Sequence, residues 1–236
     1  MEQTKIINQI KIKIDEQEVL RYLGYRNDSV HEINANIKEI IRQEITRIYS
    51  LLESKGIYQL LDLSSLSPEG IILTNRGHKF MVNKEIIDLL KNVEYLILSV
   101  VTIGPNIEKA VKEKFRQNQY LGAMVLDAAG TVAVKTVGQW LNHIIEQKSL
   151  QEGLKLSRYF EPGSRDWDIR EQKKIFQILK PERIGVKLNP SLMMHPLKSL
   201  SWIRGMGYNL AHSYRDEFSC QYCLMDHCLF RKRTVG

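Results

Sequence analysis

The chain has 236 residues and a net charge of +7; 43% of the residues are hydrophobic and 26% are charged. A chain of this length and composition buries enough surface to fold without a disulfide or a structural metal. The N-terminus lacks the apolar core of a secretory signal, and the longest apolar stretch, 120–134, is interrupted by Asp127 and is too short to span a bilayer. We therefore expect a cytoplasmic protein that does not cross a membrane.

The positive charge is compatible with two interpretations. It favours attraction to an acidic partner, or it simply reflects a solvated basic surface. No basic tract alternates with aromatic residues, and the basic run at 231–233 is short and terminal, so we expect no nucleic-acid partner.

The first part of the chain predicts a strand, a long helix and several short strands. Residues 10–14 alternate apolar and charged side chains, which is the period of a half-buried strand. Ser29 and Glu32 form a capping box, and apolar residues then recur at helical spacing, so we expect a helix that ends at Gly56. Residues 57–82 mix short apolar pieces with turn residues, which predicts strands and turns.

The middle of the chain predicts a buried strand and a long helix. Residues 95–101 form a continuous apolar run rich in branched side chains, which is typical of a strand buried on both faces. Residues 120–147 predict one helix with many small residues, which suggests that another element or a ligand approaches its backbone closely. Along this helix runs a polar line of residues spaced by four: Asp127, Thr131, Lys135 and Gln139. The line faces either water or a ligand.

Beyond residue 150 the pattern predicts a strand at 154–160, a helix at 170–179, a strand at 184–188, and a loop with a short helix at 198–203. Strands and helices do not alternate strictly, so we expect a mixed α+β fold and not a doubly wound one. We divide the chain into a body, 1–204, and a cysteine-bearing tail, 205–236.

The most informative segment is 157–167, which has the sequence Ser-Arg-Tyr-Phe-Glu-Pro-Gly-Ser-Arg-Asp-Trp. Pro-Gly-Ser predicts a turn that exposes backbone groups beside an arginine, whose planar fork suits a carboxylate. The helix that follows presents N-terminal amides nearby. From the residues alone, a site for an amino-acid-like or nucleoside ligand and an ordinary strand–turn–helix both stay open.

The order of these residues resembles a known family. Arg-x-x-x-Pro-Gly, then Trp, then Glu-Gln-Lys-Lys-x-Phe is similar to the activation (reactivation) region of cobalamin-dependent methionine synthase. Other similar blocks occur in the same order, at 19–25, 102–105, 126–134, 184–188 and 193–201. The resemblance covers most of the chain and implies a mixed α+β fold with a mainly antiparallel twisted sheet and packed helices, in a short stand-alone form.

The resemblance also implies a function. Members bind S-adenosylmethionine and dock onto a corrinoid-bearing methyltransferase protein; a low-potential electron donor reduces inactive Co(II), and the methyl group traps the resulting Co(I). The family's ligand arginine corresponds to Arg158, which would hold the methionyl carboxylate. The turn would line the adenosyl group. The candidate ligand-binding residues are therefore Arg158, Tyr159, Glu161, Pro162, Gly163, Ser164, Asp127 and Lys135. We expect this turn to border a pocket open to a partner's cobalt centre.

The chain departs from the family at three places. The arginine-to-proline spacing is one residue longer than in full-length synthases, Lys135 stands where a glutamate is usual, and Asn189-Pro190 replaces another polar pair. A lysine would repel the ammonium and sulfonium of the ligand. Two alternatives therefore stay open: an iron–sulfur redox activator, or a corrinoid-protein binding module, neither of which binds S-adenosylmethionine.

The three cysteines lie within nine residues of one another, as Cys220, Cys223 and Cys228. Thiolates at this spacing suit one iron–sulfur or zinc centre, and His227 offers a fourth ligand for zinc. The other interpretation is three reduced thiols in a polar tail. Because stand-alone corrinoid activators have a similar tail and reactivation needs a low-potential electron, we expect a 4Fe–4S cluster, with zinc as the alternative.

Overall fold

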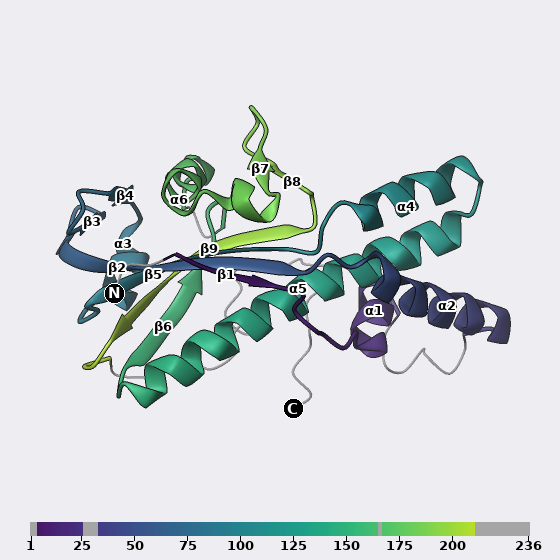
Figure 1. Cartoon of the computed structure of the whole chain (residues 1–236), viewed down its shortest axis with the longest axis horizontal. Helices are drawn as coiled ribbons and strands as arrows, with labels where there is room; N and C mark the ends of the chain where they lie inside the picture. Colours follow the sequence, from purple (N-terminus) through teal and green to yellow (C-terminus); the bar gives the residue numbers. More distant parts are fainter. Residues whose placement is uncertain (1–3, 26–32, 165–166, 211–236) are drawn as a thin grey trace.

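The computed structural model describes residues 4–25, 33–164 and 167–210 (Figure 1). In this part of the chain, seven strands form one antiparallel sheet in the order β4-β3-β2-β5-β9-β6, and β1 pairs with the first part of β2. A small hairpin of β7 and β8 stands apart from it. The strands are β1 Lys5–Asn8, β2 Lys55–Ser67, β3 Ile71–Thr74, β4 Lys79–Met81, β5 Tyr95–Thr102, β6 Lys155–Phe160, β7 Lys187–Leu188, β8 Met194–His195 and β9 Ser199–Gly207.

Helices cover both faces of the sheet (Figure 1). The long helix α5 crosses one face, together with α1, α2 and α4, and α3 and α6 lie on the other. The helices are α1 Glu16–Tyr22, α2 Ala35–Leu51, α3 Lys84–Leu89, α4 Asn106–Arg116, α5 Tyr120–Gln151 and α6 Gln172–Leu179, with short 3-10 turns at Ile169–Glu171 and Pro181–Ile184.

Strand β5 supplies both hydrophobic cores. Ile97 and Val101 belong to the core under α5, whereas Leu96 and Leu98 belong to the core on the opposite face. Alternate residues of a strand point to opposite faces, so a strand covered on both sides needs a continuous apolar run. The predicted strand at 95–101 is confirmed.

Helix α5 confirms the predicted long helix and extends it to Gln151. By length and composition it could cross a membrane, which corrects our length argument from 120–134 alone. In this fold, however, 67% of its most apolar window is buried inside the protein, because α5 packs against β2, β5, β6 and β9. Here its hydrophobicity is that of a core helix.

Two predictions near the N-terminus are wrong. Residues 10–14 are not a strand: the first strand is Lys5–Asn8, and Ile10 and Ile14 are buried from an extended segment outside it. Helix α2 ends at Leu51, and Gly56 lies in β2, where a Cβ would touch Leu141 of α5 at 3.4 Å. The capping box at 29–32 lies outside the described residues; Asn34, whose side chain accepts from the Asn36 amide at 2.8 Å, caps α2.

The largest error is at 198–203, where we expected a loop with a short helix. This segment is the start of β9, a central strand that pairs with β5 from Ser199 to Met206. The strand predicted at 184–188 is also mostly wrong, since only Lys187–Leu188 is extended. The division after residue 204 falls within β9, and Leu210 is buried. Residues 211–236 lie outside the described part, so the tail stays a prediction.

Candidate ligand site at the end of strand β6

The predicted turn follows directly from β6. Arg158 and Tyr159 belong to the strand, and the backbone then closes through Gly163, whose φ is +87°. The positive φ favours glycine, and a Cβ at Gly163 would lie 3.0 Å from the end of the Ile169 side chain, which would have to shift slightly.

The turn uses its own amides. The Gly163 N–H donates to the Trp167 carbonyl at 2.8 Å, and the N–H and hydroxyl of Ser164 donate to the Glu161 carbonyl at 3.1 and 2.7 Å. Pro162 has no N–H. Our expectation that the turn presents backbone amides to a ligand is therefore wrong for these residues. What the turn offers instead is the carboxyl group of Glu161.

The Glu161 carboxyl group is perturbed by its surroundings. Burial raises its pKa from 4.5 to about 6, and the positive charge of Lys135 on α5 offsets part of that rise. The residue as a whole keeps some solvent contact. The structure thus brings two predicted site residues, one from the turn and one from the long helix, into electrostatic contact.

Lys135 is held from a third element. Its ammonium donates a hydrogen bond to the Tyr22 hydroxyl of α1 and lies 5.1 Å from the centre of the Tyr22 ring. The Arg21 guanidinium lies 4.5 Å from the same ring and is bound by Glu18 at 2.7 Å. Lys135 therefore binds the Tyr22 hydroxyl and ring, and its charge also acts on the Glu161 carboxyl group.

Asp127 and Thr131 lie further toward the start of α5 on the same polar line. Both bind the Lys198 ammonium, at 2.9 Å from the Asp127 carboxylate and 2.8 Å from the Thr131 hydroxyl. Lys198 immediately precedes β9. The polar line is therefore not one site: Asp127, whose side chain is half exposed, and Thr131 bind Lys198, whereas Lys135 binds Tyr22 of α1.

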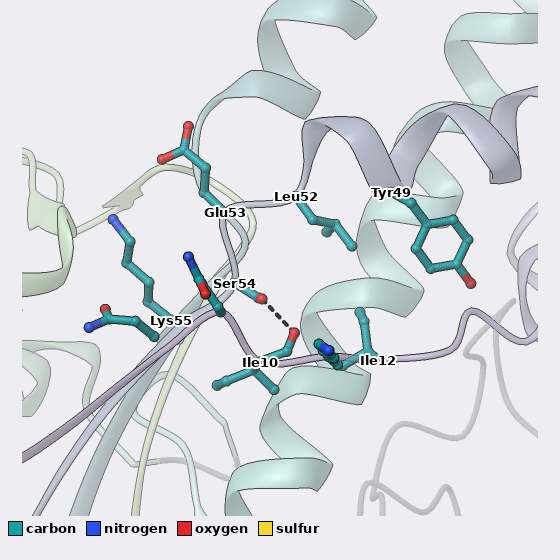
Figure 2. Close-up of a pocket in the computed structure, with 10 residues that line it drawn as sticks. Ile10, Ile12, Tyr49, Leu52, Glu53, Ser54 and Lys55 are labelled. Carbon is teal, nitrogen blue, oxygen red and sulfur yellow. Dashed lines mark hydrogen bonds between the residues drawn. The ribbon is translucent and has the colours of Figure 1, made fainter.

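An open cavity of about 810 Å³ lies at another place in the fold. Figure 2 shows that Ile10 and Ile12, from the segment after β1, lie across from Tyr49 and Leu52 at the end of α2. The Ser54 hydroxyl donates to the Ile10 carbonyl at 2.6 Å. Strand β1 flanks β2, whereas β6 forms the opposite edge beyond β5 and β9. This cavity is therefore not the pocket that we expected beside the Arg158-led turn.

Comparisons with known proteins give one sequence relative and one structural neighbour of note. No family model matches the chain. Methionine synthase of Mycobacterium leprae (strain TN) is 24% identical over 139 residues, a match that covers 51% of this chain and 12% of the synthase. The crystal structure of the MetH reactivation domain bound to AdoHcy matches with a TM-score of 0.62, over 90% of this chain and 80% of that chain, at 11% identity.

The chain has the fold of the methionine synthase reactivation domain. Both the α+β class with its antiparallel sheet and the resemblance stated from the sequence are confirmed at the level of the fold. The curated relative is much longer than this chain, since the match spans only 12% of it.

Within this reactivation-domain fold, the sequence analysis missed two residues that contact the candidate site. Tyr22 and Lys198 bind Lys135 and Asp127 from segments far away along the chain. The blocks at 19–25 and 193–201 were noticed only as parts of the resemblance, and local spacing gives no signal for such contacts.

The predicted metal ligands, Cys220, Cys223 and Cys228, lie outside the described residues. Among residues 4–25, 33–164 and 167–210, no group of three or more histidine, cysteine or acidic side chains is placed to hold a metal ion. The cysteine centre stays a prediction from the sequence.

Proposed function

We propose that this protein binds S-adenosylmethionine at the end of β6 and supports the reductive remethylation of a corrinoid carried by a methyltransferase protein. The observation that carries this proposal is the shared fold over 90% of the chain with a reactivation domain that binds S-adenosylhomocysteine. The Arg158-led turn at the end of β6 adds to it, because Arg158 and Glu161 supply a cationic and an acidic side chain within four residues.

Each end of the ligand has a matching residue. Arg158 presents a planar fork of N–H donors that suits the methionyl carboxylate. The Glu161 carboxyl group, three residues further on, suits the ammonium or sulfonium group. Since the amides of Gly163 and Ser164 are used within the turn, recognition by the turn falls to these side chains.

The chemistry is carried by the ligand and the partner's cobalt. A low-potential donor supplies one electron that reduces Co(II) to Co(I). The Co(I) electron pair attacks the methyl carbon, the carbon–sulfur bond breaks, and S-adenosylhomocysteine leaves as a neutral thioether. The protein contributes by holding the methyl group in position, which turns a rare encounter into an intramolecular step.

The cysteine tail fits an electron-transfer centre. Three thiolates are soft ligands suited to an iron–sulfur cluster, and such clusters reach very negative potentials. When bound, a cluster would supply the low-potential electron that cobalt reduction needs. The residues that would hold it are Cys220, Cys223 and Cys228.

The test is binding of S-adenosylmethionine and S-adenosylhomocysteine by calorimetry, followed by a corrinoid assay. Wild-type protein should bind, and Arg158→Met should weaken binding about 10- to 100-fold, the loss expected for a charged hydrogen bond. Arg116→Met, on the exposed surface of α4, is the matched control. With a Co(II) corrinoid protein, S-adenosylmethionine and a low-potential one-electron reductant, the wild type should convert the Co(II) absorption spectrum to that of methylcobalt.

A second function is distinguished by the same experiments. The positive charge of Lys135, which acts on the Glu161 carboxyl group, favours a module that has lost the methyl donor. If neither ligand binds but the purified protein contains iron and sulfide and reduces Co(II), the protein is an electron-delivery module. If it contains no cluster and does not support reduction, a corrinoid-protein binding module is the remaining candidate.

A further inference from the structure

One side of the α4–α5 hairpin carries an exposed apolar patch. The two helices lie side by side and extend beyond the sheet (Figure 1). Phe115 on α4, and Tyr120 and Met124 on α5, keep 45%, 56% and 53% of their surface accessible. The Phe115 and Tyr120 rings lie 6.2 Å apart, and Met124 follows Tyr120 by one helical turn. Large apolar side chains that gather in this way on a surface mark contact sites.

The Tyr120 ring is oriented before any contact is made. Its hydroxyl donates to the Asn118 side chain at 2.7 Å. Asn118 closes the turn between the two helices with a φ of +60°, a conformation that asparagine tolerates better than most residues with a Cβ. Oriented aromatic anchors are typical of protein–protein contacts, whereas insertion into a lipid surface requires no fixed geometry. The patch therefore suits a folded protein.

The patch lies on the side of the hairpin away from α2. A Cβ at Gly122 would lie 3.2 Å from both the Glu44 carboxylate of α2 and the Lys114 ammonium of α4, so α2 packs on the side of α5 that Gly122 occupies. Met124 is two residues further on, about 200° around the helix. It therefore points away from α2, which agrees with its exposure.

The same face of α5 leads from the patch toward the candidate ligand site. Met124, Thr131 and Lys135 fall within about 20° of one line along the helix, at 3.6 residues per turn. Leu197 adds another exposed apolar side chain beside this line, with 47% of its surface accessible. The adjacent Lys198 binds the Thr131 hydroxyl at 2.8 Å. The face is therefore continuous from the end of the hairpin to the middle of α5.

A single folded partner is large enough to cover this face. From Tyr120 to Lys135 the helix rises about 22 Å, at 1.5 Å per residue. A standard protein interface buries about 800 Å² on each partner, which corresponds to a patch about 30 Å across. A partner seated on the exposed patch therefore also reaches the part of α5 that carries Lys135, a candidate ligand-binding residue.

The flank of the patch sets the charge of the partner. Helix α4 exposes three basic side chains, Lys109, Lys112 and Arg116, against one acidic side chain, Glu113. The whole chain carries a net charge of +7. A contact surface with an apolar centre and an acidic rim is complementary to this face. A second copy of the chain would bring the same basic flank, which disfavours contact between two copies.

We propose that the face formed by Phe115, Tyr120, Met124 and Leu197 is the surface on which the corrinoid-bearing partner docks, through an apolar centre and an acidic rim of its own. The inference rests on the proposed function, because it names where that partner is bound. It makes Tyr120 and Met124 the anchors of the complex, separate from the residues that bind the methyl donor.

The test is the dissociation constant of a cobalamin-loaded methyltransferase protein in the Co(II) state, measured by fluorescence anisotropy with the full chain. Tyr120→Ala should weaken binding about 10- to 30-fold, the loss typical of a central aromatic anchor. Met124→Glu places a negative charge in the patch and should weaken binding at least as much. Added salt should also weaken binding of the wild type, because charges on the rim of a contact are screened.

The chain supplies matched controls away from the patch. Tyr208, after β9, is 52% exposed, and Leu150, near the other end of α5, is 44% exposed. Tyr208→Ala and Leu150→Glu should leave the dissociation constant unchanged, and melting temperatures show whether each variant is folded. In the remethylation assay, Tyr120→Ala should raise the KM for the corrinoid protein and leave kcat unchanged, because the contact binds ground state and transition state equally.

Calorimetry with S-adenosylmethionine separates this inference from the proposed function. If the wild type binds the ligand, the inference alone is overturned by a corrinoid-protein affinity that is absent or that Tyr120→Ala and Met124→Glu leave unchanged. If the wild type binds neither the ligand nor the corrinoid protein, the proposed function fails and the inference with it. Loss of affinity in both variants supports the inference, even for a chain that does not bind the ligand.

Two other occupants of the face would give different results. If the chain alone sediments as a dimer that Met124→Glu dissociates, the face joins two copies. If the wild type pellets with vesicles of phosphatidylserine and phosphatidylcholine and Met124→Glu does not, the face binds lipid. Either result overturns the inference.

Discussion

Replacing Glu161 by glutamine should stabilise the protein at neutral pH. Burial raises the pKa of this carboxyl group from 4.5 to about 6, so the fold favours the neutral form. The stability that this preference contributes is fully present below pH 4.5 and is lost as the pH rises through about 6. A rise of this size corresponds to about 2 kcal/mol, and since Glu161 keeps some solvent contact we expect about 1–2 kcal/mol.

The assay is urea denaturation of wild type and Glu161→Gln at several values between pH 4.5 and pH 8. The variant should be more stable above pH 6 by about 1–2 kcal/mol and equal to wild type near pH 4.5. Asp168 is the control of opposite sign: the Arg170 side chain holds its pKa down at about 2, so Asp168→Asn should bring no gain at neutral pH. Identical pH profiles for wild type and Glu161→Gln would refute the argument that burial raises the pKa of this carboxyl group.

Lys114→Met should lower the free energy of unfolding by about 3–5 kcal/mol, because it leaves the buried Glu44 carboxylate without its partner at 2.5 Å. In the same urea titration, Lys91→Met breaks an exposed pair and should cost less than about 1 kcal/mol; equal losses would contradict the buried-pair argument. Gly163→Ala should cost about 1–2 kcal/mol, since φ is +87° there, and an unchanged melting temperature would count against the turn geometry. Anaerobic reconstitution should yield iron and sulfide, and stoichiometric zinc in their place would select the alternative metal. Iron and sulfide, or the zinc, should be lost when serine replaces Cys220, Cys223 and Cys228.

The sequence predicted the elements whose buried residues are mostly hydrophobic. Strand β5 and helix α5 were recognisable because most of their inward residues are apolar. Strand β9 was missed because its buried positions include Ser199, Ser201 and Arg204. These polar groups are tolerated only because distant partners satisfy them: Ser201 donates to Gln172 at 3.1 Å, and Arg204 donates to the Ser157 carbonyl at 2.5 Å. The residue pattern of one segment does not reveal partners that are distant in sequence.

The candidate site shows the same division between local and distant information. The residues of the turn were predictable, because Pro-Gly-Ser and the preceding arginine are adjacent in sequence. The hydrogen bonds of these residues were not predictable. The amides of the turn bond within the turn, and Tyr22 binds Lys135, which lies more than a hundred residues away in sequence. A local motif therefore predicted the candidate site, and tertiary contacts determine the charges around it.

The charge of the candidate site matters because Lys135 is expected to repel a cationic ligand. The resemblance implied that Lys135 replaces a glutamate and so repels a cationic ligand. In the structure the turn contributes the carboxyl group of Glu161, whose pKa is lowered by the charge of Lys135. The pair carries no net charge when Glu161 is ionised, and Tyr22 takes up the lysine ammonium. Repulsion depends on the summed field of all nearby groups. The lysine alone therefore does not exclude a sulfonium ligand, because the negative charge of Glu161 offsets the positive charge of Lys135.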